Sequence, residues 1–232
     1  MRGLASQLGL GYNLLMSIRN KPFVSGEYYH LYNRGNSKQT IFRDKEDYSR
    51  FITLLYTCNG INNFNNFSAK NTSEKDPYLF ERGKSLVSIG AYVLMPNHFH
   101  ILITEKEKNG ISKFMQKLST GYVMFYNKKY KRTGGLFEGK FKSRHLDSDK
   151  YLKYIFSYIH LNPIKLIQKD WKEKGIKNKT GAFSYLNSYL FSSFIDYQKK
   201  ERKQNFILDF NSFPKYFSSC KNFNEEIIEW LS

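Results

Sequence analysis

Cysteine is scarce in this chain. Only Cys58 and Cys220 occur among its 232 residues, and they form no Cys-x-x-Cys pair. A disulfide framework or a cysteine-based zinc site would need more cysteines at closer spacing. The composition therefore favours a reducing, cytoplasmic setting.

Long apolar runs are also missing. No stretch of 18 or more apolar residues is present, so no segment is expected to span a membrane. Glycine and polar residues interrupt the apolar part of the first fifteen residues, which do not resemble a signal peptide. Met16 opens a segment that reads like a start, and we expect residues 1–20 to form a poorly ordered leader.

Acidic residues are outnumbered by basic ones. The chain has 37 Lys and Arg against 20 Asp and Glu, a net charge of +17. A protein this basic commonly binds a polyanion, and nucleic acid is the first candidate. Hydrophobic residues make up 41% of the chain, which is enough for a folded core.

Hydrophobic periodicity predicts short strands that alternate with amphipathic helices. Asp44 suits the N-cap of the first helix, with Asp47 three residues later, and the last helix is expected to stop at Pro163. The segment 59–77 is rich in Asn and Ser and indicates a surface loop. The strands are expected at 26–36, 85–94 and 98–104, with a turn and a basic strand at 134–147, and the helices at 43–58, 111–130 and 148–163.

This β-α-β-β-α-β order, followed by a further helix, predicts an α+β protein. The simplest architecture is a ferredoxin-like or RRM-like antiparallel sheet with helices on one face. The two middle strands are expected to pair as a hairpin across Met-Pro-Asn. Four residues of helix 111–130 should face the core: Phe114, Leu118, Tyr122 and Phe125.

The pattern weakens after about residue 168. We therefore divide the chain into the leader 1–20, a main domain 21–168 and a basic, aromatic C-terminal extension 169–232. The extension is expected to contain partial helices, such as 223–231. Three roles are open for the extension: it could bind DNA, pack on the core or pair subunits.

Two of the five histidines, His98 and His100, stand one residue apart in an apolar strand. Side chains alternate along a strand, so both imidazoles point to one face, about 7 Å apart, with Phe99 opposite. Such a pair can share a metal ion, although it can equally cap a hairpin or satisfy local hydrogen bonds. Hard oxygen ligands elsewhere would favour Mg²⁺ or Mn²⁺ over zinc.

The helix 148–163 supplies candidate partners for the two histidines. Its tyrosines at 151, 154 and 158 follow one face, and core packing accounts for most of them. Asn162 lies one turn after Tyr158 on the same face, so its amide oxygen could be a third metal ligand. A nearby cation favours the phenolate of Tyr158, which suits nucleophilic attack on a polarised phosphodiester.

Four segments in this order carry a family resemblance: YHLYNRGN, YVLMPNHFHILI, GLFEGKFKS and YIHLNPIK. Together they resemble the REP-associated tyrosine transposases, a branch of the single-tyrosine HUH transposases related to the IS200 type. His98-Phe99-His100 matches the His-hydrophobic-His motif directly. The resemblance runs from about Tyr28 to Lys165.

The resemblance implies the HUH endonuclease fold and a specific chemistry. It assigns His98 and His100 to a divalent metal, Tyr158 as the nucleophile, and Asn162 as a further polar ligand. It implies cleavage of single-stranded, hairpin-associated DNA that leaves a 5′-phosphotyrosine and a free 3′-OH, without a nucleotide cofactor. It also implies a bacterial protein, monomer or homodimer, associated with the nucleoid through its DNA.

Basic side chains are candidates for contacts to DNA phosphates, and binding should weaken steeply with salt. Tyr122 and Tyr126 are more readily explained by packing than by base stacking. His145 and His160 are not expected to bind metal. The candidate DNA-binding residues are Arg34, Lys117, Lys140, Lys142, Arg144 and Lys165.

Three other functions remain open at this point. A non-catalytic, domesticated nucleic-acid-binding module could use the same fold, although binding alone needs no metal site. A replication initiator or relaxase would better fit a chain with a helicase segment, and no P-loop motif is present. A hydrolytic nuclease would attack with water and leave no covalent protein–DNA adduct.

Overall fold

The computed structural model describes residues 22–63, 76–215, 223–225 and 227. The leader expected at 1–20 lies outside the described residues. The helix expected at 223–231 is described only in part, and its described residues are helical.

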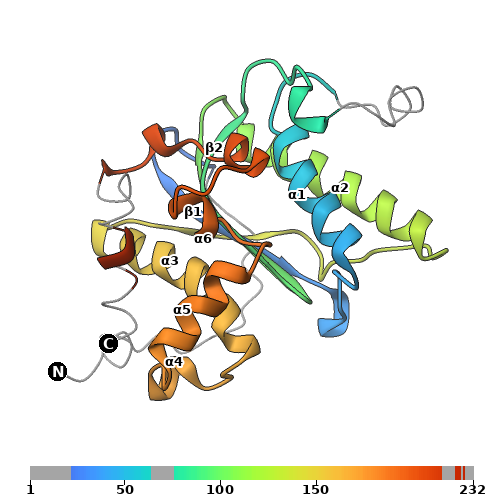
Figure 1. Ribbon diagram of the computed structural model, residues 1–232. Helices are drawn as coiled ribbons and strands as arrows, with labels where there is room; N and C mark the ends of the chain where they lie inside the picture. Colours follow the sequence, from blue (N-terminus) through green and yellow to red (C-terminus); the bar gives the residue numbers. More distant parts are fainter. Residues whose placement is uncertain (1–21, 64–75, 216–222, 226, 228–232) are drawn as a thin grey trace.

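A four-stranded antiparallel sheet forms the centre of the molecule (Figure 1). Its spatial order is β2-β3-β1-β4, which is the ferredoxin-like order, and the predicted α+β class is confirmed. β2 and β3 form the expected hairpin. The strands are β1 (Tyr28–Arg34), β2 (Val87–Met95), β3 (His98–Glu105) and β4 (Lys142–His145).

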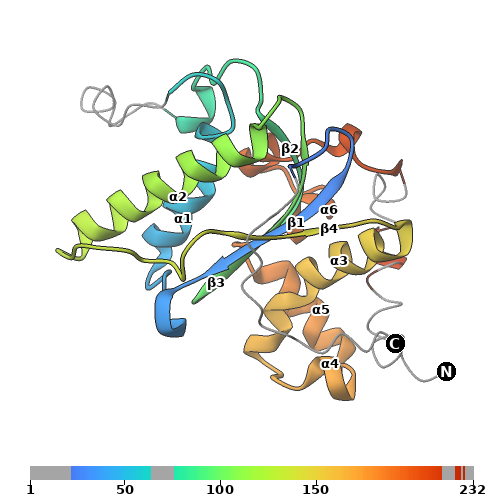
Figure 2. The same ribbon diagram turned by 180° about the vertical axis from the view of Figure 1, so that it is seen from behind.

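Helices cover both faces of the sheet, as the two opposite views show (Figures 1 and 2). The helices between the strands, α1 (Lys45–Thr57) and α2 (Gly110–Lys129), lie on one face as expected. The expectation of helices on one face alone needs correction, because apolar residues on the other face of the sheet form a second core with later helices. These are α3 (Asp149–Leu161), α4 (Trp171–Lys174), α5 (Lys179–Ser188) and α6 (Phe194–Tyr197). Short 3₁₀ turns complete the structure: η2 (Asn36–Lys38), η4 (Pro77–Leu79), η5 (Asn162–Leu166), η6 (Lys203–Ile207) and η7 (Phe210–Ser212).

Local sequence signals account for the helix ends. The Asp44 carboxylate accepts the Asp47 N–H at 3.1 Å and caps α1, as predicted. The hydroxyl of Ser148 caps α3. The α-helix α3 ends at Leu161, close to the predicted stop at Pro163, and the chain continues as the 3₁₀ turn η5. Proline lacks only an N–H that the first turn of a helix does not use, so it can open that turn.

The segment expected to be a surface loop, 59–77, begins inside the protein. The Asn59 side chain is buried and bonds both the N–H and the carbonyl of Val87 at 3.0 Å. Residues 64–75 lie outside the described residues. Asn59 therefore acts as a buried polar link to the start of β2, which a loop composition does not predict.

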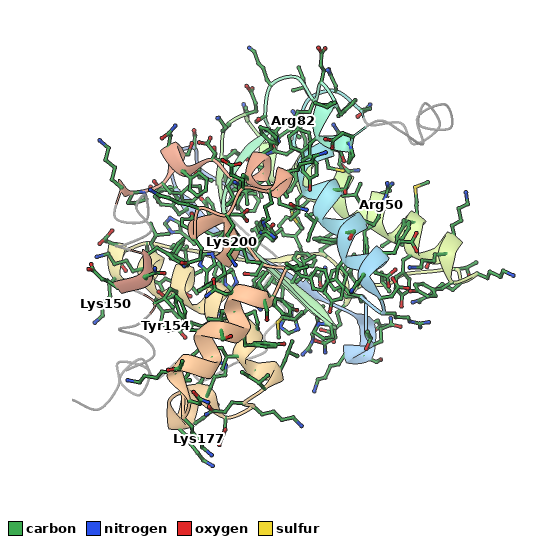
Figure 3. The ribbon with its side chains drawn as sticks, in the orientation of Figure 1. Arg50, Arg82, Lys150, Tyr154, Lys177 and Lys200 are labelled. Carbon is green, nitrogen blue, oxygen red and sulfur yellow. The ribbon has the colours of Figure 1, made fainter. Side chains whose placement is uncertain are left out.

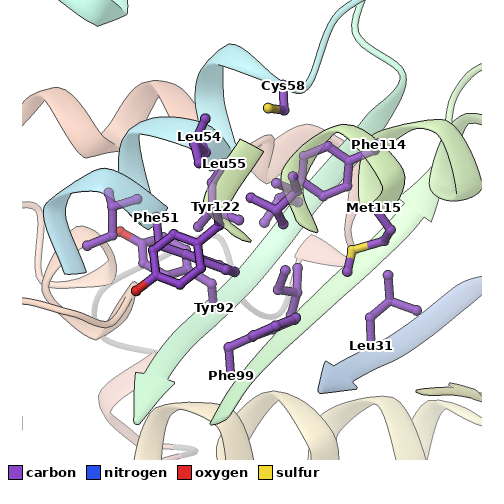
Figure 4. Packing of buried hydrophobic residues seen from close by; sticks show 14 of the residues in the cluster. Leu31, Phe51, Leu54, Leu55, Cys58, Tyr92, Phe99, Phe114, Met115 and Tyr122 are labelled. Carbon is purple, nitrogen blue, oxygen red and sulfur yellow. The ribbon is translucent and has the colours of Figure 1, made fainter. Parts of the chain in front are cut away.

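One hydrophobic core lies between the sheet and the α1–α2 pair (Figure 4). Leu31 and Phe99 from the sheet meet Phe51 of α1 and Tyr122 of α2, and all four are fully buried. Phe125 lies at the edge of this core. The hydroxyl of Tyr122 donates to a backbone carbonyl, so this tyrosine is a packing residue, as expected.

A second core lies between the opposite face of the sheet and α3. Val93 and Leu102 from the strands pack there with Ile155 and Phe156. Trp171 of the C-terminal extension is buried in the same core. The described part of the extension thus packs on the sheet, while the domain boundary at 168 stays a prediction. No helix in the described part of the chain is long and apolar enough to cross a membrane.

Replacement of Phe99 by alanine should lower the free energy of unfolding by about 3–5 kcal/mol, because the ring is fully buried between β3 and the α1–α2 layer. Guanidinium unfolding measures the change. Met124→Ala on α2 is the matched control, since its side chain is 67% exposed and should change stability by less than about 0.5 kcal/mol. A loss below about 1 kcal/mol for Phe99→Ala would contradict this packing.

Candidate active site

The two histidines of the motif lie on the α3 side of β3. Phe99, between them, points into the opposite core, as strand alternation requires. The turn before β3 is held firmly, because the Pro96 carbonyl accepts the N–H groups of both Ile41 and Phe42. His98 therefore starts from a fixed backbone position.

Each motif histidine has its Nδ1 atom engaged by a neighbour. His98 Nδ1 lies 2.6 Å from Oδ1 of Asn97, and His100 Nδ1 lies 2.8 Å from Nε2 of His30 on β1. The two rings stand edge to face with their centroids 5.1 Å apart. The Nε2 atoms are therefore the nitrogens that remain for a common ligand.

Helix α3 brings Tyr158 and Asn162 to the same place. The Tyr158 ring lies 5.3 Å from the His100 ring and 6.2 Å from the His30 ring, in edge-on arrangements. Asn162 is only 3% exposed and lies close enough to His98 to influence its pKa. The structure thus brings together all four residues predicted from the motif spacing, His98, His100, Tyr158 and Asn162.

Two buried polar atoms at this site have no hydrogen-bond partner among the described residues. They are Nε2 of His100 and Oδ1 of Asn162. A buried polar atom without a partner costs free energy, so two such atoms at one site fit a bound cation. Within the described ranges no cluster of three or more His, Cys, Asp or Glu could hold a metal. The donors that fit one are two imidazoles and an amide oxygen.

The histidines at the site are held neutral. Burial lowers the pKa of His98 to about 4, and the charges of Lys165 and Arg34 act in the same direction, while Asn162 opposes them. Burial lowers the pKa of His30 to about 3 and puts that of His100 well below its usual value. Neutral imidazoles keep a lone pair for a metal, whereas protonated ones do not.

Lys172 of α4 is a site residue that sequence reasoning missed. Its ammonium lies 3.7 Å from the centre of the Tyr158 ring, in a cation–π contact. Burial lowers the pKa of Lys172 to about 8, and the charge of Lys165 adds to the effect. A partly desolvated cation beside a tyrosine would stabilise its phenolate or an approaching phosphate.

The segment around α4 holds Lys172 in place. The preceding residue, Trp171, is buried in the second core. The Gln168 side chain donates to the Gly175 carbonyl at 2.7 Å and accepts the Lys177 N–H at 3.1 Å, closing the segment. No residue pattern near Lys172 signals this contact, because it depends on how the extension folds back.

The candidate DNA-binding residues divide into two groups. Lys142 and Arg144 of β4 pair in register with Tyr32 and His30, so they share the histidine face of the sheet. Lys165 is exposed on η5 beside Asn162, and Lys140 is exposed just before β4.

Two other candidate DNA-binding residues already form an ion pair or hydrogen bonds within the protein. Arg34 lies opposite His98 in register but forms an ion pair with Glu138 at 2.6 Å. The ammonium of Lys117 donates to the Gly60 and Asn62 carbonyls on the α1–α2 side of the molecule. The structure does not bring Lys117 to the site, because α2 covers the opposite face.

Positive charge alone does not mark the site. Figure 3 shows basic side chains on widely separated parts of the surface, including Arg50 on α1, Arg82 near η4 and Lys177 before α5. What distinguishes the candidate site is that two imidazoles, a tyrosine and a buried amide lie close together there.

The remaining histidines and tyrosines have other surroundings. His160 is buried in the second core, where it contacts the Phe156 carbonyl and the Ser193 hydroxyl. His145 is exposed and lies 2.6 Å from a carboxylate oxygen of Glu27. Tyr154 stacks on Tyr158 at 6.2 Å, one turn further from the histidines. That neither His145 nor His160 is a ligand stays a prediction.

Comparisons with known proteins found a family model that matches part of the chain. Residues 81–162 match the family model described as "Transposase IS200 like". That segment includes all four predicted site residues but neither His30 nor Lys172. No curated protein matches the sequence.

A solved structure shares the fold. It is described as "Structure of the REP associates tyrosine transposase bound to a REP hairpin", and it is 13% identical with a TM-score of 0.51. The match covers 86% of this chain and 98% of that one. The resemblance to IS200-like transposases is therefore confirmed over residues 81–162, and the solved structure confirms the fold.

In the metal-free protein, His98 should remain neutral at about pH 5.5, where an ordinary imidazole is mostly protonated. Its pKa is lowered on folding, so the unfolded chain takes up the proton first. The free energy of unfolding should therefore fall as the pH drops from about 6.5 towards 4. ¹⁵N NMR of the imidazoles and denaturant unfolding test this, and titration of His98 near pH 6.5 would contradict the buried site.

Proposed function

We propose that this chain, in which residues 81–162 match the IS200-like transposases, is a metal-dependent tyrosine transposase. Its substrate is single-stranded, hairpin-associated DNA, which it cleaves and rejoins through a 5′-phosphotyrosine. Tyr158 is the nucleophile, and His98, His100 and Asn162 hold Mg²⁺ or Mn²⁺.

One observation carries the proposal. A tyrosine, two neutral histidines and a buried amide meet on one face of the sheet, although Tyr158 and His98 come from separate elements. Two of the atoms that meet there, His100 Nε2 and Asn162 Oδ1, have no partner among the described residues. A module that only bound nucleic acid would have no need to bury such atoms beside a tyrosine.

The reaction follows from the groups present. Tyr158 Oη attacks the phosphorus of the scissile phosphodiester, forming a new P–O bond as the bond to the 3′ oxygen breaks. The phenolic proton is lost to solvent, and the departing 3′ oxygen takes up a proton to give a 3′-OH. A bound divalent cation would take up negative charge from the phosphate oxygens. Attack of a 3′-OH on the phosphotyrosine reverses these changes and rejoins DNA without ATP.

Lys172 assists this step through its charge. Its ammonium contacts the face of the Tyr158 ring and is itself partly desolvated, so its field at the phenolate is little screened by water. The extension thereby contributes to the reaction although it lies outside the matched segment.

Basic residues on the edge strand of the sheet support a path for the DNA across the site. Lys142 and Arg144 stand on β4, an edge strand, and face the same side as the histidines. Lys165 is exposed on η5, three residues after Asn162. A single strand that crosses from β4 to η5 would pass over Tyr158 with cations on both sides, and its affinity would fall as salt rises.

Wild-type protein mixed with Mn²⁺ and end-labelled hairpin DNA from the flanks of its own gene should form a covalent adduct on a denaturing gel. Tyr158→Phe should form none, because it lacks the attacking oxygen. Tyr154→Phe is the matched control from the next turn of α3 and should retain the adduct. Cleavage without any adduct would identify a water-using nuclease, and binding without cleavage would favour the non-catalytic module.

Lys172→Met should slow cleavage by roughly 10²-fold, because it removes a desolvated cation beside the nucleophile. Lys172→Arg should retain much of the rate. Lys172 loses its charge as the pH rises through about 8, so kcat/KM of the wild type should fall above that pH. The arginine variant should lack this alkaline limb. Lys169→Met, at an exposed position nearby, is the control; an unchanged rate in Lys172→Met would contradict the assignment.

A further inference from the structure

His30 has no part in the motif that defines the site, yet it lies against one of the motif histidines. Its Nε2 atom is 2.8 Å from His100 Nδ1, and the two rings stack with centroids 4.9 Å apart. Both residues are buried, with 5% and 7% of their surface exposed. The contact is between diagonal neighbours on adjacent strands, because His30 pairs with Leu102 and His100 pairs with Tyr32.

The direction of this hydrogen bond decides which nitrogen of His100 has a lone pair available for a cation. A neutral imidazole has one N–H and one lone pair. If His30 accepts through Nε2, the proton of His100 sits on Nδ1 and the lone pair on Nε2. Nε2 of His100 is the atom that is buried without a partner among the described residues.

The second motif histidine shows the same arrangement with a different partner. His98 Nδ1 lies 2.6 Å from Oδ1 of Asn97, and a carboxamide oxygen can only accept. His98 therefore carries its proton on Nδ1 and presents the lone pair of Nε2. A consistent site needs His100 in the same tautomer, and His30 Nε2 lies within hydrogen-bond distance of its Nδ1.

We propose that His30 is a positioning residue that accepts the Nδ1 proton of His100 and so fixes the tautomer and orientation of its Nε2 towards the cation. The inference rests on the metal-dependent function proposed above. Acceptors behind a metal-binding imidazole hold its ring and increase its basicity, and their loss typically weakens metal binding by about 10–100-fold.

Mn²⁺ binding to the DNA-free protein, followed by the EPR signal of the free ion, tests this directly. His30→Leu removes the acceptor at similar bulk and should weaken Mn²⁺ binding by roughly 10–100-fold. His30→Gln places an amide oxygen near the position of Nε2 and should restore most of the affinity. Tyr32→Phe is the matched control, because its ring also lies beside His100, at 5.9 Å, and only its hydroxyl is removed.

A second readout needs no variant. ¹H–¹⁵N NMR of the metal-free wild type should show His100 as the Nδ1–H tautomer, and His30→Leu should lose this preference. An Nε2–H tautomer in the wild type would overturn the inference even if the variants fail to fold. Equal Mn²⁺ affinity in the wild type and His30→Leu would also overturn it, and so would a His30→Gln variant as weak as His30→Leu, which would indicate direct ligation.

The outcome also separates the inference from the proposed function. Absence of Mn²⁺ binding by the wild type, or binding that survives His98→Ala, would contradict the metal-dependent function itself. Binding that is lost in His98→Ala but unchanged in His30→Leu would contradict only the role of His30.

Discussion

Strand alternation in β3 is the constraint on which the rest of this structure depends. Phe99 commits one face of the strand to the α1–α2 core, so His98 and His100 must occupy the other face. That face is then covered by α3, which brings Tyr158 to the histidines. Burial in turn keeps the imidazoles neutral and ready to bind a cation. Fold stability and chemistry are therefore set by alternate residues of a single strand.

Much of the site could be predicted because its signals are local. The spacing of two between His98 and His100, and of four between Tyr158 and Asn162, places each pair on one face of its element. The strand and helix order was also enough to predict the sheet and its hairpin. These patterns depend on periods of 2 and 3.6 residues, which a sequence displays directly.

The other site contacts join residues that are far apart in the sequence, and the spacing of residues along one element does not predict them. His30 reaches His100 through the register of β1 against β3, and Lys172 reaches Tyr158 because Trp171 anchors the extension in the second core. Lys117 is the opposite case, since its charge suggested DNA while its helix lies on the far face. Charge and residue type identify candidates, but the face of the sheet decides which of them can act together.

We propose that His98, His100 and Asn162 hold one cation beside Tyr158. A crystal structure of the protein with Mn²⁺, with the ion located by its anomalous scattering, tests this arrangement. A single strong peak is expected at about 2.0–2.3 Å from Nε2 of both histidines and Oδ1 of Asn162. A site that is empty at saturating Mn²⁺, or an ion bound elsewhere on the molecule, would contradict it.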